Sequence, residues 1–123
     1  MEAKAINIKE KHSLFSKQWH PHRIATVDNM QVILAKIQGE FVWHSHDEED
    51  ELFQVVKGTL YMQFRDRTEV VKEGEMIVVP KGVEHNPSTK DGEEVHLLLF
   101  EKMNTAHTGN VETERTQNDY PWI

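Results

Sequence analysis

The sequence contains no cysteine among its 123 residues, which excludes disulfide bonds and thiolate metal ligands. No apolar run approaches the ~20 residues that a membrane-spanning helix needs, and residues 1–13 contain no signal-peptide core. A dense basic stretch is also missing and the net charge is −7, which argues against nucleic acid and anionic membranes as partners. We therefore expect a single cytoplasmic domain, since a chain of this length has room for one compact core.

Helical periodicity is missing as well, because no stretch of useful length repeats apolar residues at helical spacing. The chain instead alternates short runs rich in β-branched and aromatic residues with Gly, Asn or Asp turns, about 8–12 residues apart. This spacing predicts an all-β fold, an antiparallel sandwich or barrel. Away from residues 39–58, the predicted strands are 23–27, 31–37, 59–64, 68–72, 76–79 and 95–101.

Two histidines precede an acidic turn in the stretch 39–58. His44 and His46 are two residues apart, and residues so spaced on an extended strand project from the same face. Glu51 follows the acidic turn, and pairing of the two flanking segments as a hairpin would place it opposite the histidines. Two imidazoles and a carboxylate that converge in this way are typical of a transition-metal site.

A third histidine follows a tight turn further along the chain. The predicted strand 76–79 runs into Pro80-Lys81-Gly82, and His85 comes three residues after the glycine. Proline presets φ and glycine permits positive φ, so this turn fixes the direction of His85. A chance H-x-H pair is common in a chain with 8 histidines, and the third histidine is what favours a four-ligand site. The predicted ligands are His44, His46, Glu51 and His85.

These two stretches resemble the paired motifs of the cupin superfamily. The first motif, G-x(about 5)-H-x-H-x(3 or 4)-E-x6-G, is matched with one residue fewer after its first glycine. Its residues here are Gly39, His44, His46, Glu51 and Gly58. The residues that match the second motif, G-x5-P-x-G-x2-H-x3-N, are Gly74, Pro80, Gly82 and His85. The final asparagine of that motif is absent, and Ser88 and Thr89 stand near its position.

The resemblance implies a fold, a ligand set and a cofactor. The implied fold is an antiparallel double-sheet jelly-roll β-barrel, and the family's metal ligands correspond to the three histidines and the glutamate. The expected cofactor is one divalent transition metal: iron, manganese, nickel, cobalt, copper or zinc. The expected organisation is an N-terminal arm (1–22), a cupin barrel (23–103) and a C-terminal tail (104–123) that packs on the barrel or on a partner.

Apolar residues near both chain ends indicate an additional contact. Phe15 and Trp19 lie in the N-terminal arm, beyond polar residues 1–12 that we expect to be loosely held. Tyr120 and Trp122 lie in the tail. A small barrel need not bury all of these side chains, so we expect a homodimer that uses the arm, the tail or both.

Three functions are compatible with such a site. The first is a metal-dependent, dioxygenase-like enzyme acting on a small organic molecule. The second is a non-catalytic module that binds or senses a sugar or carboxylate. The third is a sugar-phosphate (mannose-6-phosphate) isomerase-like enzyme, which needs cations for phosphate; Lys81, Arg65 and Arg23 are candidates at uncertain positions. Fold alone does not separate these functions, and no catalytic residue is assigned.

Strand parity suggests a mostly apolar pocket beside the metal, although each lining residue could equally belong to the core. The candidate pocket residues are Val42, Phe53, Val55, Met62, Phe64 and His96. His96 is the polar residue of an apolar strand, and it is either a satisfied buried histidine or a group that orients a ligand. His20 and His22 flank Pro21, and the sequence favours surface positions for both over a metal role.

Overall fold

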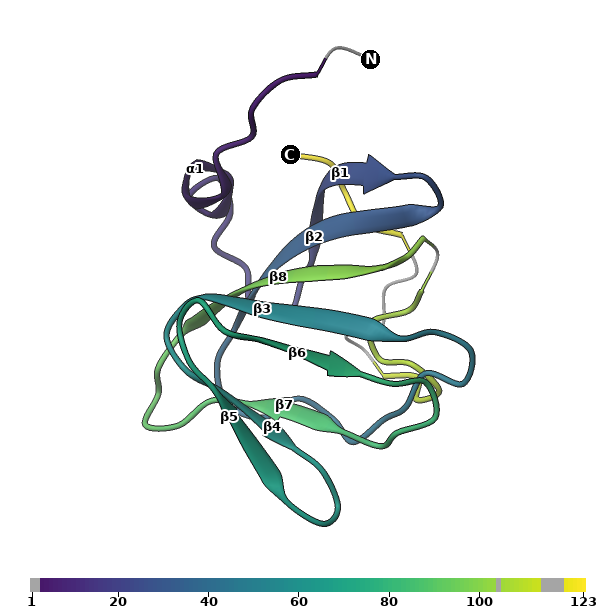
Figure 1. The fold of residues 1–123 in the computed structure, drawn as a ribbon. Coiled ribbons are helices and arrows are strands. Elements are labelled where there is room, and N and C mark those ends of the chain that lie inside the picture. Colours follow the sequence, from purple (N-terminus) through teal and green to yellow (C-terminus); the bar gives the residue numbers. More distant parts are fainter. Residues whose placement is uncertain (1–2, 104, 114–118) are drawn as a thin grey trace.

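The computed structural model describes residues 3–103, 105–113 and 119–123, in which one short helix precedes a series of strands (Figure 1). The helix is α1 (Ile8–His12). The strands are β1 (His22–Val27), β2 (Met30–Ile37), β3 (Glu51–Lys57), β4 (Leu60–Gln63), β5 (Thr68–Val71), β6 (Met76–Val79), β7 (Asn86–Ser88) and β8 (Val95–Lys102). The predicted all-β fold is therefore confirmed, and the predicted strands outside the first motif differ from the observed ones only at their ends.

The strands form two antiparallel sheets, which Figure 1 shows as two layers. One sheet has the order β1-β2-β8-β3-β6, and the other has the order β5-β4-β7. The core lies between them and takes Ile33, Val55 and Leu97 from the first sheet and Leu60 and Met62 from the second. Strand pairing does not close these two sheets into one barrel within the described part of the chain, so the sandwich is confirmed and the closed jelly-roll barrel is not.

Alternation along β8 decides which side chains reach the interior. Val95, Leu97, Leu99 and Glu101 are buried, whereas the residues between them are only partly buried. Successive side chains of a strand point to opposite faces, so Glu101 lies on the same inner face as Leu97 and Leu99. A carboxyl group is thereby placed inside an otherwise apolar strand face.

The sequence suggested a hairpin between the two halves of the first motif, and this prediction is wrong. Strand β3 pairs with β6 and β8, and not with the segment that carries His44 and His46. That segment lies instead beside the chain around β7, where isolated bridges join Glu40 to Ser88 and His44 to His85. Gly39, with φ of 82°, begins the passage from the first sheet to the second, a conformation that glycine adopts without strain.

The chain ends pack on the sheets. His12 of α1 is buried and its Nε2 lies 3.1 Å from the carbonyl oxygen of Leu97, so this part of the expected loose N-terminus is held in place. Tyr120 is buried in the core cluster, whereas Trp122 is 56% exposed. The part of the tail at 104 and 114–118 lies outside the described residues. Among the described helices, none has the length and apolar character needed to cross a membrane.

Candidate metal centre

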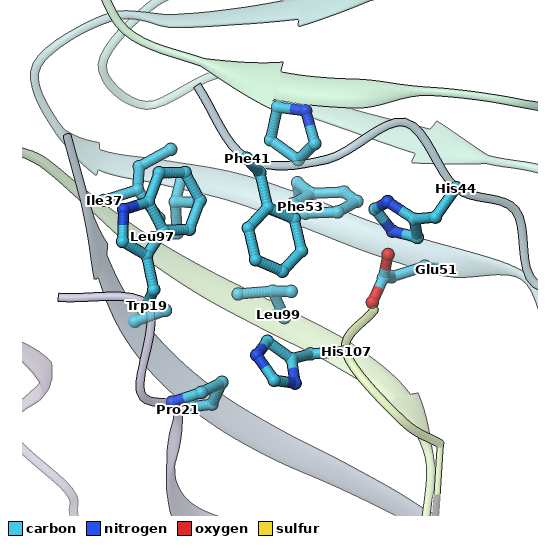
Figure 2. Close-up of a pocket in the computed structure, with 12 residues that line it drawn as sticks. Trp19, Pro21, Ile37, Phe41, His44, Glu51, Phe53, Leu97, Leu99 and His107 are labelled. Atoms are coloured by element: carbon cyan, nitrogen blue, oxygen red, sulfur yellow. The ribbon is translucent and has the colours of Figure 1, made fainter. Parts of the chain in front are cut away.

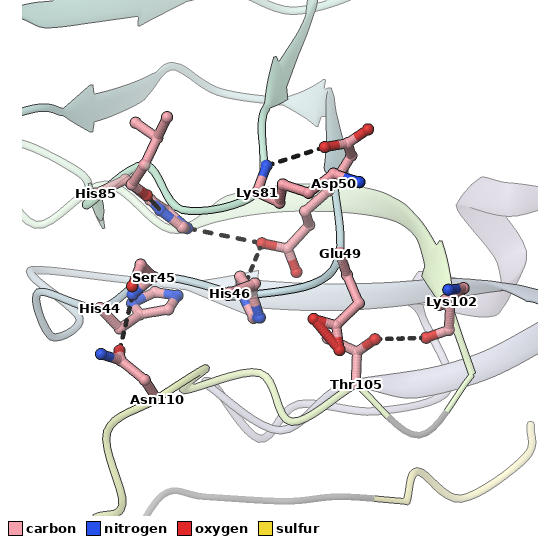
Figure 3. Close-up of polar contacts among 12 residues, drawn as sticks. His44, Ser45, His46, Glu49, Asp50, Lys81, His85, Lys102, Thr105 and Asn110 are labelled. Atoms are coloured by element: carbon pink, nitrogen blue, oxygen red, sulfur yellow. Dashed lines mark hydrogen bonds and ion pairs between the residues drawn. The ribbon is translucent and has the colours of Figure 1, made fainter.

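Three separate parts of the fold supply the four predicted ligands. His44 and His46 lie on the extended segment after Gly39, and Glu51 is the first residue of β3. His85 precedes β7 and pairs with His44 through two backbone hydrogen bonds, from His44 N to His85 O (3.0 Å) and from His85 N to His44 O (2.9 Å). This pairing, rather than a hairpin with β3, brings the histidines together (Figure 3).

The four side chains converge on one point. One potential ligand atom from each lies within 4.8 Å of all the others. His46 Nε2 is 3.3 Å from Glu51 Oε1, and His85 Nε2 is 3.7 Å from the same oxygen. Opposite ligands at ~2.0–2.2 Å from an ion are about 4 Å apart, so this cluster is close to the size of a coordination shell.

Backbone carbonyls fix the orientation of two of the imidazoles. His44 Nδ1 donates to the Val42 carbonyl and His85 Nδ1 donates to the Val83 carbonyl, each at 2.9 Å. A carbonyl only accepts, so the proton of the neutral ring is on Nδ1 and the Nε2 lone pair is left for the site. The same local contact, to the residue two positions earlier, thus prepares both histidines as ligands.

Buried polar atoms in the cluster face only one another. All four side chains are buried, and His46 Nε2, His85 Nε2 and Glu51 Oε1 have no hydrogen-bond partner among the described residues outside the cluster. A buried polar atom without a partner costs about 1–3 kcal/mol, and three such atoms directed at one point are better explained by a missing shared partner than by independent defects. A divalent cation satisfies all three atoms at once, so the residues fit a metal.

The electrostatics keep His44 and Glu51 in the states that metal binding needs. Burial, helped by the neighbouring His85, lowers the pKa of His44 to about 4, so this ring is neutral at pH 7. Burial acts against ionisation of Glu51, but hydrogen bonding and charge from His46 and His85 outweigh it and lower its pKa to about 2. Burial also lowers the pKa of His46, but Glu51 outweighs it and the net shift is upward.

A fifth ionisable side chain, Glu101, lies against Glu51 and was not predicted. Glu101 is fully buried, and neither of its carboxyl oxygens has a hydrogen-bond partner among the described residues other than Glu51 itself. Burial and the charge of Glu51 raise the pKa of Glu101 well above its usual value. The signal for it was present in the sequence, because Glu101 continues the inward positions of the strand predicted at 95–101.

A small cavity of about 40 Å³ lies next to the cluster, which is room for a few water molecules (Figure 2). His44 and Glu51 form part of its wall, so the cavity opens onto the candidate metal position. The remaining wall residues are mostly apolar: Trp19, Pro21, Ala35, Ile37, Phe41, Phe53, Pro87, Leu97, Leu99 and His107.

The candidate pocket residues are dispersed in the structure. Phe53 lines the cavity, while Val55 and Met62 lie in the core. Val42 is half-buried, and Phe64 is buried in the core cluster. His96 points to the outer face of the first sheet, where its Nε2 is 3.0 Å from Glu94. Trp19, Phe41 and His107 line the cavity instead, and no spacing in the sequence singled them out.

The other histidine pair, His20 and His22, is half-buried and does not reach the cluster. The rings are 5.5 Å apart, and His22 stacks on Phe15 at 4.2 Å. Neither residue belongs to a group of three or more potential ligands in the described chain. The sequence favoured surface positions for both, whereas the structure places both half-buried and away from the candidate metal site.

Known proteins similar to this chain include bacterial proteins matched by sequence and by structure. The cupin domain family model matches residues 30–101. The uncharacterized protein YdbB of Bacillus subtilis (strain 168) is 40% identical over 82 residues, 66% of each chain. A solved cupin-2 domain-containing protein from Shewanella frigidimarina NCIMB 400 is 46% identical with a TM-score of 0.76, covering 79% of this chain and 93% of that one. Protein NMB1881 from Neisseria meningitidis is 32% identical with a TM-score of 0.72, covering 80% and 99%.

Proposed function

We propose that this protein is a metal-binding enzyme with dioxygenase-like activity on a small organic molecule. The premise is that the chain belongs to the cupin domain family. The observation that carries the proposal is the convergence of buried, unpaired donor atoms from His46, His85 and Glu51 next to His44. Structural metal sites are usually closed and rich in cysteine, whereas this cluster adjoins a cavity.

The donor set restricts the metal. Three imidazole nitrogens disfavour calcium and magnesium, which prefer oxygen, and they suit iron, manganese, nickel, cobalt, copper or zinc. Three neutral imidazoles and one carboxylate leave a divalent ion with a net charge near +1 and, at six-coordination, with about two positions for other ligands. When bound, such an ion supplies Lewis-acid activation of an oxygen donor.

The surrounding residues prepare the site for an apolar molecule. The Val42 and Val83 carbonyls orient His44 and His85, and Glu51 contributes the negative charge. The apolar wall offers contact to the hydrocarbon part of a ligand. Together these features support chemistry at the metal on a substrate with little charge of its own.

The sugar-phosphate isomerase alternative lacks support from the described residues. Arg23 donates to Gln31 and Asp119, and Arg65 pairs with Glu84, so both arginines are engaged elsewhere. No lysine or arginine of the described chain lines the cavity, although a phosphate group needs a cationic partner. Non-catalytic binding of a small carboxylate is supported by the same site geometry and differs only in the absence of turnover.

Elemental analysis of protein purified without added metal tests the metal centre. We expect about one equivalent in the wild type and in His96→Ala, whose side chain lies outside the cluster, and almost none in His46→Ala. Iron, followed by oxygen uptake with a panel of small carbonyl compounds, supports the dioxygenase function. Ligand-induced stabilisation without oxygen uptake supports the binding function, and no metal after reconstitution contradicts both.

A further inference from the structure

A segment outside the region matched by the family model contributes a residue to the cavity wall. Residues 105–111 follow β8 and lie beyond residue 101, where the family match ends. His107 of this segment is buried and lines the cavity together with His44 and Glu51. Figure 2 shows His107 directed into the cavity below Phe41, with His44 and Glu51 at one end and Trp19 at the other.

Residues 105–111 are attached directly to the segment that carries His44 and His46. Ser45, between the first two candidate ligands, donates its N–H to Asn110 Oδ1 at 2.9 Å and accepts from Asn110 N at 2.9 Å (Figure 3). Gly109 approaches the same backbone so closely that a Cβ atom there would be 2.2 Å from Ser45 O. Asn110 thus pairs with Ser45 through both its side chain and its backbone.

Aromatic contacts determine where His107 lies. Its ring stacks on Phe41 with 5.4 Å between centroids and meets the edge of Tyr120 at 6.1 Å. Tyr120 is itself fixed, because its hydroxyl donates to the Thr105 carbonyl at 3.0 Å. His107 is therefore positioned from both sides, with its ring at the cavity wall.

The cavity wall defines what can be bound there. Among the described wall residues, His107 is the one ionisable side chain besides His44 and Glu51, which lie at the candidate metal position. The rest of the wall is apolar, and the volume of about 40 Å³ admits a ligand of only a few heavy atoms while the segment is in place.

We propose that residues 105–111 form a strap over the metal cavity, and that His107 on this strap is its specificity-determining residue. The ligand class is a small, mostly apolar molecule with an oxygen donor at the metal and a second polar atom at His107. This inference rests on the proposed metal centre. It assigns ligand selection to a part of the chain outside the residues shared with the family.

Cobalt-loaded protein and acetohydroxamate test the role of His107, with the visible cobalt absorption as the readout for Kd. We expect His107→Leu to keep one equivalent of cobalt and to weaken acetohydroxamate binding by about three- to tenfold, the effect of one hydrogen bond. His107→Gln should restore part of the affinity, and the control His96→Leu should bind like the wild type. Inorganic phosphate, which finds no lysine or arginine in the described cavity wall, should bind at least about tenfold more weakly than acetohydroxamate.

Removal of cobalt by EDTA tests the strap. Asn110→Ala should release cobalt several-fold faster than the wild type, while Asn29→Ala, in the turn between β1 and β2, should not. Wild-type protein that takes up no cobalt overturns the metal centre and the inference together. Protein that binds cobalt but shows equal acetohydroxamate affinity in His107→Leu and His96→Leu overturns the inference alone, as does loss of cobalt in His107→Leu. Equal release rates for the two asparagine variants overturn the strap.

Discussion

The chain contains two H-x-H pairs, His44 with His46 and His20 with His22, and they have different surroundings. Within each pair the rings are at similar separations, 5.1 Å in the first and 5.5 Å in the second. The first pair meets Glu51 and His85, whereas the second meets the ring of Phe15. Local spacing therefore brings two imidazoles together in both places, and a metal centre is possible only where distant parts of the fold add a carboxylate and a third imidazole.

The largest difference between the pairs is expected in metal binding. His44→Ala should reduce metal affinity by at least about 100-fold, because even residues that only orient metal ligands contribute 10–100-fold. His22→Ala should leave affinity unchanged, since no carboxylate of the described chain joins its pair in a cluster of potential ligands. Competition with a coloured chelator measures both constants. Equal affinities for the two variants would contradict the assignment of the site to the first pair.

The next largest difference between the two H-x-H pairs is expected in the dependence of unfolding free energy on acid pH. Burial holds the pKa of His44 at about 4, against 6.5 in the unfolded chain, so the unfolded state takes up the proton more readily. In metal-free protein this histidine costs no stability above pH 6.5, and up to about 3 kcal/mol is lost as the pH falls towards 4. Glu51, with its pKa lowered to about 2, extends the loss in the same direction below pH 4.5.

Chemical denaturation from pH 8 to pH 4 measures this dependence. His44→Gln should flatten the curve between pH 6.5 and 4. His22→Gln should flatten it less, because His22 is half-buried, although burial lowers its pKa as well. With metal present, protons compete with the ion for the neutral imidazoles, so bound metal should be lost on acidification. An unchanged curve for His44→Gln would show that this side chain is not buried as described.

A smaller loss of unfolding free energy is expected when the contact between residues 105–111 and Ser45 is disturbed. Gly109→Ala places a Cβ atom against Ser45 O at a residue with φ of 59°, and we expect a loss of about 2–3 kcal/mol in unfolding free energy. Gly39→Ala is the matched control, because its φ is 82° but nothing lies within 4 Å of the added atom. It should cost about 1 kcal/mol, the cost of the backbone conformation alone. Urea titration compares the two, and an equal loss would argue against close packing of residues 105–111.

The smallest effect is expected near the second pair. Trp122 is 56% exposed and lies under the Arg23 guanidinium, 5.5 Å from the ring centroid, next to His22. Trp122→Ala should lower monomer stability by less than about 1 kcal/mol, the range of an exposed cation–π contact. If the homodimer expected from the sequence uses this surface, the variant should shift towards monomer in light scattering. A wild-type protein that is monomeric at all concentrations would contradict that expectation.

Much of the fold followed from local pattern. The predicted strands and the inward direction of Val55 and Met62 agree with the structure, because turn residues and two-residue alternation act over short distances. The pairing of His44 with His85 could not be predicted from local pattern, because a segment that leaves its sheet can pair with any free edge. Glu101 carried a signal in its strand parity, whereas His107 carried none, since its position depends on contacts with Phe41 and Tyr120.

Sequence by itself determined which residues form the candidate ligand set and that the fold is all-β. Spacing and turn chemistry are properties of the chain alone, and they place His44, His46, Glu51 and His85 at defined points on strands and turns. Tertiary structure alone decided how these points meet. The bridge between His44 and His85, and the strap that brings His107 to the cavity, are contacts between segments far apart in the chain, and backbone pairing and packing select them only when the two sheets come together.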